Sequence, residues 1–177
     1  ANFTINQYTI TFNPTGGTFK NGTTDDYVVE KDYGTTVSGP GNMTKTGYTF
    51  VGWGTELSGG TIYEPTSIPS VTSDVTYYAQ WTPIEYSVKF DGNGHTSAST
   101  NGMTFKYDES KNLNANGYLK TGYNFVGWNT QKDGSGIQYA NKQEVKNLTS
   151  TKGEVITLYA QWSPITYTIK FNGNGNT

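Results

Sequence analysis

Few residues of this chain have the type and spacing that catalysis requires. His95 is the only histidine, and a lone imidazole in the loop Gly92–Thr96 fits a solvated turn better than a general base. The adjacent acids Asp25–Asp26 and Asp108–Glu109 do not alternate as the oxygen ligands of a calcium loop do. Because the chain has no cysteine, it has no thiol nucleophile, disulfide or zinc knuckle. The sequence therefore predicts a protein that is not an enzyme, with no catalytic, cofactor-binding or metal-binding residue.

Two glycine-rich strings could be mistaken for phosphate-binding loops, Asp91–Gly94 and Asn172–Gly175. Neither is followed by a helix signal or by the Lys-Ser/Thr pair with which such loops hold phosphate. Asp-Gly and Asn-Gly accept positive φ angles at low cost. Both strings are therefore interpreted as tight turns that lead out of a strand.

Tyrosine rings offer one further kind of chemistry, which is stacking on sugar rings. A coplanar exposed row of tyrosines would favour a carbohydrate-binding module. Burial of the same rings in a contact between repeats would favour a structural role, and the sequence leaves both interpretations open. The candidates for ligand contact or inter-repeat contact are Tyr63, Tyr78, Tyr139 and Tyr159.

The composition excludes other classes of protein. Only 15% of the 177 residues are charged, the formal net charge is −2, and the lysines are spread along the chain without forming a basic stripe. Nucleic-acid binding is therefore not expected. No apolar run approaches the ~20 residues of a membrane-spanning helix, so membrane insertion is not expected either. The abundance of Gly, Thr, Asn and Tyr favours strands and turns over helices.

The elements that carry these residues are repeated along the chain. Self-comparison finds three anchor sequences that recur in the same order, with loops of slightly different length between them. Loops tolerate such length changes, whereas packed strands do not. The anchors are Tyr8–Phe12, repeated at Tyr86–Phe90 and Tyr167–Phe171; Thr46–Trp53, repeated at Thr121–Trp128; and Tyr78–Trp81, repeated at Tyr159–Trp162.

The repeats divide the chain into a first unit at 1–83, a second unit at 84–164, and a segment at 165–177 that begins a third repeat. Proline in the links after Trp81 and Trp162 makes these connections short and stiff, so we expect tandem units arranged as a rod.

The last segment carries an isolated strand sequence. We expect Tyr167–Phe171 to pair with a sheet of the preceding unit or of a neighbouring molecule. The second case gives the chain a route to self-association through this strand.

The anchors read as strands because apolar residues alternate in them, as in Tyr86–Phe90. Second strands are expected at Tyr27–Glu30 and Met103–Tyr107. Helix signals are weak: Asp108–Leu113 and Tyr139–Leu148 have the residues for a turn or two, and we expect short irregular turns there. The predicted fold class is α+β, predominantly β, with little helix in each unit.

The middle anchor, Thr46–Trp53, contains a glycine between apolar residues. We expect Tyr48 and Phe50 on one face of this strand and Val51 and Trp53 on the other. Gly52 allows a bulge or a close backbone approach at this point.

Aromatic side chains are expected to form the core of each unit, because a unit of ~80 residues without disulfides is otherwise marginally stable. Burying one large aromatic ring removes about 150–250 Å² from water. The expected core residues are Tyr8, Phe12, Tyr48, Phe50, Trp53 and Trp81 in the first unit, and Tyr86, Phe90, Tyr123, Phe125, Trp128 and Trp162 in the second.

Together the anchors resemble a known family. The order Tyr-x-Ile/Val-x-Phe, Thr-Gly-Tyr-x-Phe-Val-Gly-Trp and Tyr-Ala-Gln-Trp is similar to the Listeria–Bacteroides repeat, the family that includes the B repeat of internalin B. The resemblance covers both units and the last segment. It implies small β-grasp-like units in tandem on secreted or cell-wall-attached bacterial proteins, with spacer, adhesive or host-contact roles and no catalytic residues.

We therefore expect a non-catalytic extracellular repeat module of a bacterial surface or secreted protein. It would act as a stiff spacer and as a protein-interaction element of the adhesin type, with an unidentified host or bacterial surface protein as its partner. A carbohydrate-binding module that uses exposed tyrosines, with a glycan as partner, is the alternative. The expected location is extracellular, at the cell surface or cell wall.

Overall fold

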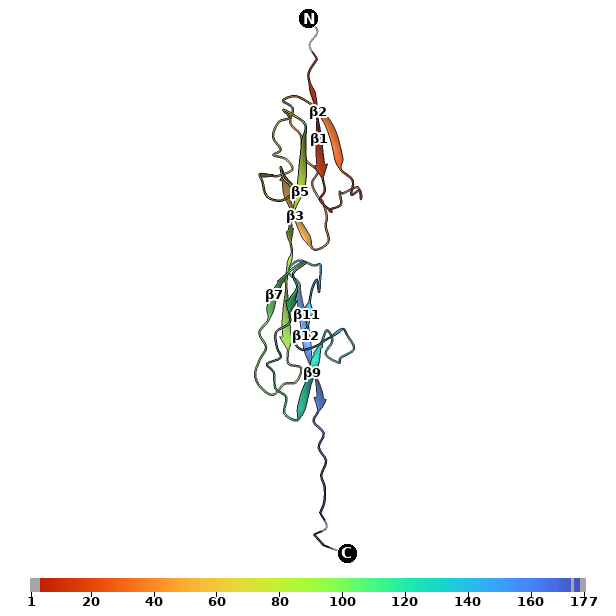
Figure 1. Cartoon of the computed structure of the whole chain (residues 1–177), viewed down its shortest axis with the longest axis vertical. Helices are drawn as coiled ribbons and strands as arrows, with labels where there is room; N and C mark the ends of the chain where they lie inside the picture. Colours follow the sequence, from red (N-terminus) through yellow and green to blue (C-terminus); the bar gives the residue numbers. More distant parts are fainter. Residues whose placement is uncertain (1–3, 173, 176–177) are drawn as a thin grey trace. The chain divides into compact units, whose positions relative to one another are not determined.

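The computed structural model describes residues 4–172, 174 and 175 (Figure 1). The chain forms two compact units. Unit 1 runs to Ile84 and also contains Lys106–Asp108 and Thr149–Lys152, and unit 2 contains the remaining residues from Glu85 onward. Three predicted positions lie outside the described residues. They are the start of the first unit at residue 1, the end of the last segment at residue 177, and Gly173 of the predicted turn.

Unit 1 is built on one five-stranded mixed sheet with the strand order β2-β1-β5-β3-β4. The first strand, β1, pairs parallel with the last, β5, and all other pairs are antiparallel. The strands are β1 (Gln7–Asn13), β2 (Tyr27–Asp32), β3 (Tyr48–Gly54), β4 (Ile62–Tyr63) and β5 (Val75–Pro83).

Unit 2 repeats this sheet, in which the long strand β12 pairs parallel with β6 and antiparallel with β9. A second, two-stranded sheet is formed by β8 (Lys111–Asn112) and β11 (Glu144–Val145). The order in the main sheet is β10 (Gln138–Tyr139), β9 (Tyr123–Asn129), β12 (Val155–Pro164), β6 (Glu85–Asp91) and β7 (Met103–Lys106).

The predominantly β prediction is confirmed, whereas the helical part of the predicted α+β class is wrong for the described residues, which contain no helix. Asp108 has a φ of 65°, so the chain turns at the first residue of the segment Asp108–Leu113. The two segments with weak helix signals instead provide Lys111–Asn112 and Glu144–Val145, which pair with each other. The expected second strands are confirmed at β2 and β7.

A bulge in the middle anchor changes which side chains face the core. The register of β3 on β5 shifts between Phe50 and Gly52, so Val51 is the extra residue. Val51 is exposed, and Trp53 lies on the same side as Phe50, with ring centroids 5.5 Å apart. The expectation that Val51 and Trp53 share a face is therefore wrong, because strict alternation ends at the bulge.

The glycine at the bulge is required by a close backbone approach. Gly52 has a φ of +154°, and a Cβ built on it would lie 2.6 Å from the carbonyl oxygen of Tyr63. Gly127 in unit 2 has a φ of +149°, and its Cβ would lie 2.8 Å from the carbonyl oxygen of Tyr139. Both the bulge and the close approach that the sequence allowed are therefore present in each unit.

Each core is centred on one fully buried tryptophan. Trp53 packs edge-on against Phe12, with centroids 4.8 Å apart, and Trp128 packs against Phe90 at 4.6 Å. Tyr86 is also buried and stacks on Phe105. The half-buried rings that pack against the two cores are Tyr8, Phe50, Tyr63 and Trp81 in unit 1, and Phe125, Tyr139 and Trp162 in unit 2.

Two expected core residues lie outside these clusters. Tyr48 is half-buried and Tyr123 is 39% exposed. They occupy the first position of β3 and β9, before the strand reaches the packed part of the sheet. The sequence pattern alone does not distinguish these rings from their buried neighbours, because both obey the same alternation.

The segment Tyr167–Phe171 forms no strand with any described part of this chain. Its alternating Tyr167, Ile169 and Phe171 are 82%, 63% and 93% exposed. The equivalent Tyr86, Val88 and Phe90 are all buried in unit 2. The expectation that this segment pairs with the preceding unit is therefore wrong for this chain, whereas pairing with a neighbouring molecule stays a prediction.

Replacing the bulge glycine should separate steric collision from simple φ strain. We expect Gly52→Ala to lower the free energy of unfolding of unit 1 by about 3 kcal/mol, because the new Cβ meets a backbone oxygen that cannot move aside. The control is Gly22→Ala, where φ is +87° but nothing lies within 4 Å, with an expected loss of about 1 kcal/mol. Chemical denaturation measures both, and equal losses would contradict the collision.

The two central tryptophans should respond differently to the same substitution. Trp53 Nε1 donates to the carbonyl oxygen of Pro40 at 2.9 Å, whereas Trp128 Nε1 is buried without an acceptor among the described residues. Both Trp→Phe changes remove similar volume, so the volume term cancels in the comparison. We expect Trp53→Phe to cost about 1 kcal/mol more than Trp128→Phe, measured for each unit by amide hydrogen exchange. A larger cost at Trp128 would contradict this.

The alkaline limit of stability should depend on a buried phenol. Burial raises the pKa of Tyr77 above its ordinary value of 10.0, and neighbouring Tyr63 raises it further. The folded unit therefore keeps this proton to higher pH than the unfolded chain does, so stability present below pH 10 is lost as pH rises through the folded pKa. We expect Tyr77→Phe to reduce the fall in denaturation midpoint between pH 9 and pH 11. An unchanged fall would show that Tyr77 does not contribute.

Candidate functional site

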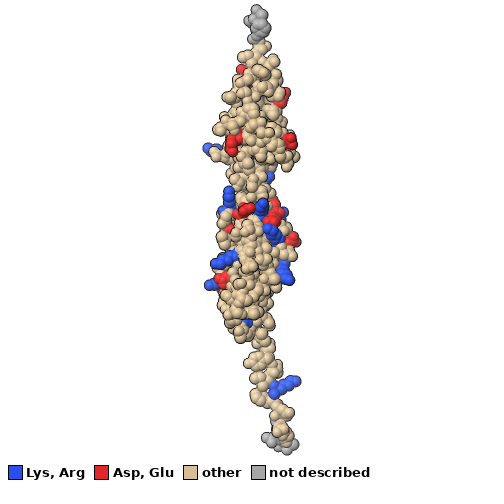
Figure 2. All heavy atoms as spheres, turned by 90° about the vertical axis from the view of Figure 1, so that its left-hand side faces the viewer, with Lys and Arg blue, Asp and Glu red and all other residues tan. Residues whose placement is uncertain are grey.

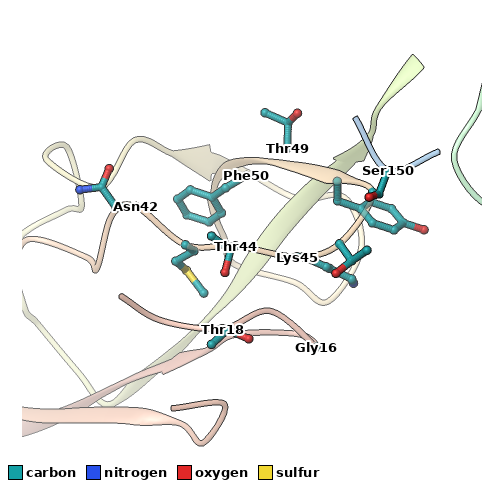
Figure 3. A pocket seen from close by; sticks show the side chains of 12 residues that line it. Gly16, Thr18, Asn42, Thr44, Lys45, Thr49, Phe50 and Ser150 are labelled. Carbon is teal, nitrogen blue, oxygen red and sulfur yellow. The ribbon is translucent and has the colours of Figure 1, made fainter. Parts of the chain in front are cut away.

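An open groove lies on unit 1 beside the start of β3. Its walls come from the turn after β1 and from the segment Asn42–Phe50, which an antiparallel bridge between Thr18 and Thr44 holds together. Figure 3 shows the side chains of Thr18, Thr44, Lys45 and Phe50 around this groove. Hydroxyl and amide side chains make up much of the lining, and Lys45 is its only charged residue.

Lys45 is held in place by several contacts. Its Nζ donates to the carbonyl oxygen of Thr15 at 2.9 Å. The same atom lies 4.8 Å from the ring centroid of Tyr48 and 5.7 Å from that of Trp81. The ammonium is thus anchored over two aromatic faces, which favours a cation.

Unit 2 carries the same groove at equivalent positions. An antiparallel bridge joins Ser97 and Leu119 through reciprocal backbone hydrogen bonds, as another joins Thr18 and Thr44 in unit 1. Lys120 Nζ lies 4.4 Å from the ring centroid of Tyr123. The other residues that line it are Ser97, Asn116, Tyr118, Thr121, Asn124, Phe125 and Trp162, so Lys120 is again the only charged residue of the lining.

The grooves can offer three kinds of contact to a ligand. The lysine supplies a charged donor, the Thr, Ser and Asn side chains supply neutral donors and acceptors, and the aromatic edges supply apolar surface. Neither lining contains a histidine or an acid that could transfer a proton. The arrangement can therefore hold a ligand through charge, hydrogen bonds and apolar contact.

The four candidate tyrosines form no exposed row, because all four are half-buried. Tyr63 and Tyr139 pack against the cores of units 1 and 2, and Tyr63 lies edge-on to Tyr77 at 6.1 Å. Tyr78 lies on β5, and Tyr159, at the matching position of β12, lies under Lys132 at 5.8 Å. None of the four lines either groove.

The candidate acids and the histidine serve local structure. His95 is exposed and packs against Tyr118, with ring centroids 4.5 Å apart. Glu109 pairs with Lys111 at 2.8 Å, and Asp108 Oδ2 accepts a hydrogen bond from Tyr48 Oη at 2.7 Å. Among the described residues, no three His, Cys, Asp or Glu side chains gather where they could hold a metal ion.

Two ionisable groups are shifted by hydrogen bonds. The bond to Asp108, together with burial, raises the pKa of the Tyr48 phenol. Ser135 donates to Asp133 from both its hydroxyl and its backbone N–H, which lowers the pKa of the Asp133 carboxyl. Both shifts move the pKa further from neutrality, so the Tyr48 phenol stays protonated and the Asp133 carboxyl stays ionised over a wider pH range.

Charged side chains are scattered over the surface. On the face that Figure 2 shows, basic and acidic side chains lie side by side in one region and are dispersed over uncharged surface elsewhere, so no large area carries a single sign of charge. In the part of the chain that the structure describes, no helix has the length and hydropathy needed to cross a bilayer.

Sequence reasoning missed the groove lysines, although a signal was present. Lys45 and Lys120 stand directly before the Thr-Gly-Tyr of the middle anchor in both copies. The repeated anchor was predicted to begin one residue after them. No sequence signal indicates the burial of Asn129, whose side chain bonds to the backbone of Gln131, Gly134 and Gly136 and shapes the loop after β9.

Three relatives resemble this chain over most of its length. In Evansella cellulosilytica, a putative Gly-rich membrane protein is 39% identical over 149 residues and a putative membrane protein is 34% identical over 166 residues. Internalin H of Listeria monocytogenes is 31% identical over 147 residues. The matches cover 80%, 92% and 78% of this chain but only 17%, 23% and 25% of the relatives. The chain thus spans about a quarter or less of these curated relatives.

The comparison with protein families covers both units. The Listeria-Bacteroides repeat domain matches residues 8–80 and again residues 86–161. These matches contain the first two anchors of both copies and the third anchor up to its final tryptophan, and they leave out only end residues of β1, β5, β6 and β12 from the two main sheets. The chain therefore belongs to the Listeria-Bacteroides repeat family and carries two tandem copies of its domain.

Proposed function

We propose that the chain is a non-catalytic extracellular module of a bacterial surface or secreted protein, in which it acts as a stiff spacer and a protein-interaction element. The observation that carries the proposal is the repetition of an entire folded unit, with the same sheet and the same central tryptophan in both copies. Repetition of a packed unit multiplies length without adding a reactive site.

The relatives support an envelope location for the protein that contains this chain. Two are named membrane proteins and one is named an internalin. All three are several times longer than the matched region, which is what a module joined to other domains requires. In such a protein, rigid repeats would hold another domain away from the cell surface.

The finer fold proposal is that each unit is a β-grasp whose helix is replaced by irregular chain. The support is the mixed sheet in which the first and last strands lie side by side and parallel. In the place where a helix would cover the sheet, buried side chains of loop residues do so instead, among them Val37, Ile68 and Val71. Units of this kind, linked through Trp81–Ile84, would stack as a rod.

A protein partner would be bound through a sheet edge. The outer strands β2 and β4 of unit 1, and β7 and β10 of unit 2, each pair with one neighbour in their main sheet. An extended segment of a partner can add to such an edge with backbone hydrogen bonds. Tyr27 and Val28 on β2 are exposed and would supply apolar contacts there.

The spacer proposal predicts how reach depends on copy number. An epitope would be displayed on a Gram-positive cell wall above one, two or four tandem copies of the repeat, and its height would be measured by super-resolution fluorescence. We expect a linear increase of about 25–30 Å per copy, because each copy is a folded body. Gly/Ser linkers of equal residue number serve as the control and should scale with the square root of length. Square-root scaling of the repeats themselves would refute the spacer role.

A further inference from the structure

The grooves of the two units share their chemistry as well as their position. The lining residues of Met43–Phe50 correspond to those of Tyr118–Phe125, and four of the lining positions are identical, namely Lys45/Lys120, Thr46/Thr121, Tyr48/Tyr123 and Phe50/Phe125. The lysine and the tyrosine of each groove lie outside the core clusters, since Lys45, Tyr48 and Lys120 are half-buried and Tyr123 is exposed. A surface feature built twice from the same residues is a candidate binding site.

The lysine side chain of each groove is preorganised to bind an anion. In unit 1 its ammonium uses one N–H for the carbonyl oxygen of Thr15, and an ammonium has three N–H donors. Its position over an aromatic ring, 4.8 Å away in unit 1 and 4.4 Å in unit 2, restricts the side chain before any ligand arrives. Such restriction reduces the entropy that binding costs.

The rest of the groove suits a ligand with an apolar face and a hydroxylated rim. In unit 2, Phe125 and Trp162 lie edge to face, with centroids 5.6 Å apart, and both line the groove. Thr96, Thr121 and Asn124 add hydroxyl and amide groups to the same lining. A pyranose ring has this composition, since its C–H face packs on aromatic rings and its hydroxyls pair with neutral polar groups.

From these contacts we propose that each groove binds an acidic polysaccharide, with a sugar carboxylate on Lys45 or Lys120. A neutral glycan would leave the lysine unused, and a purely apolar peptide would leave the hydroxyl and amide groups of the wall unpaired. The groove of unit 2 is the stronger site, because in unit 1 the Asp108 carboxylate bonded to Tyr48 repels an anion. The proposal is independent of the spacer role.

The test is an NMR titration of the full 177-residue chain with a galacturonic acid tetrasaccharide. The carboxyl-reduced form of the same tetrasaccharide, which has no charge, is the matched probe. We expect saturable shifts of backbone amides in Thr44–Phe50 and Leu119–Phe125, with tighter binding at the second segment. We expect the affinity of the uncharged probe to be lower by a factor of about ten or more, because this probe loses the charge-assisted hydrogen bond.

Lysine variants assign the two sites. Lys120→Met should weaken binding in unit 2 about tenfold and leave unit 1 unchanged, and Lys45→Met should do the reverse. Lys120→Arg keeps the charge and should retain most of the affinity, which separates loss of charge from loss of fold. Lys89→Met, at an exposed position of β6, is the matched control and should change neither site.

Three results with the two sugar probes would overturn the proposal. The first is the absence of saturable shifts in both segments at millimolar tetrasaccharide, and the second is equal binding of the charged and uncharged probes. The third is an affinity of unit 2 that survives Lys120→Met in a variant whose spectrum remains that of a folded protein. Binding of an unrelated acidic peptide with the same affinity would also overturn it, because the hydroxylated ligand would then have no role.

Discussion

The structure depends on the burial of one indole ring in each unit, directly after a glycine at which two stretches of backbone approach too closely for a side chain. Trp53 and Trp128 follow directly on a bulged glycine, and the bulge turns each indole to the same side as the preceding Phe50 or Phe125. The aromatic cluster that results replaces the disulfides on which many small extracellular domains rely. The bulged register of β3 on β5, and of β9 on β12, positions the rings of this cluster, and loop residues pack against it.

The repeat pattern predicted the number of units and their β character because strand alternation and tandem self-similarity are local properties of a sequence. The same alternation was misleading at Val51, since a single extra residue exchanges the two faces of a strand. It also did not separate Tyr123 from its buried neighbours. Position along the strand, which decides whether a ring reaches the packed part of the sheet, depends on tertiary structure.

Less of the candidate site than of the fold could be predicted from the sequence. Single residues with well-known chemistry contact nearby side chains instead, as His95 does with Tyr118 and Glu109 with Lys111. The grooves are lined by lysine, threonine and asparagine, which are common surface residues and give no motif by themselves. Only the fold brings the turn after β1 next to the start of β3, so a sequence could show that Lys45 and Lys120 recur but not what surrounds them.

The parallel pairing of the first and last strands has a mechanical consequence. When a unit is pulled from its two ends, the force enters through β1 and leaves through β5, or through β6 and β12 in the second copy. Because these neighbours run in the same direction, the load acts along the strands and shears all their cross-strand hydrogen bonds at once instead of opening them one by one. This connectivity makes each unit resist extension along the line between its two ends.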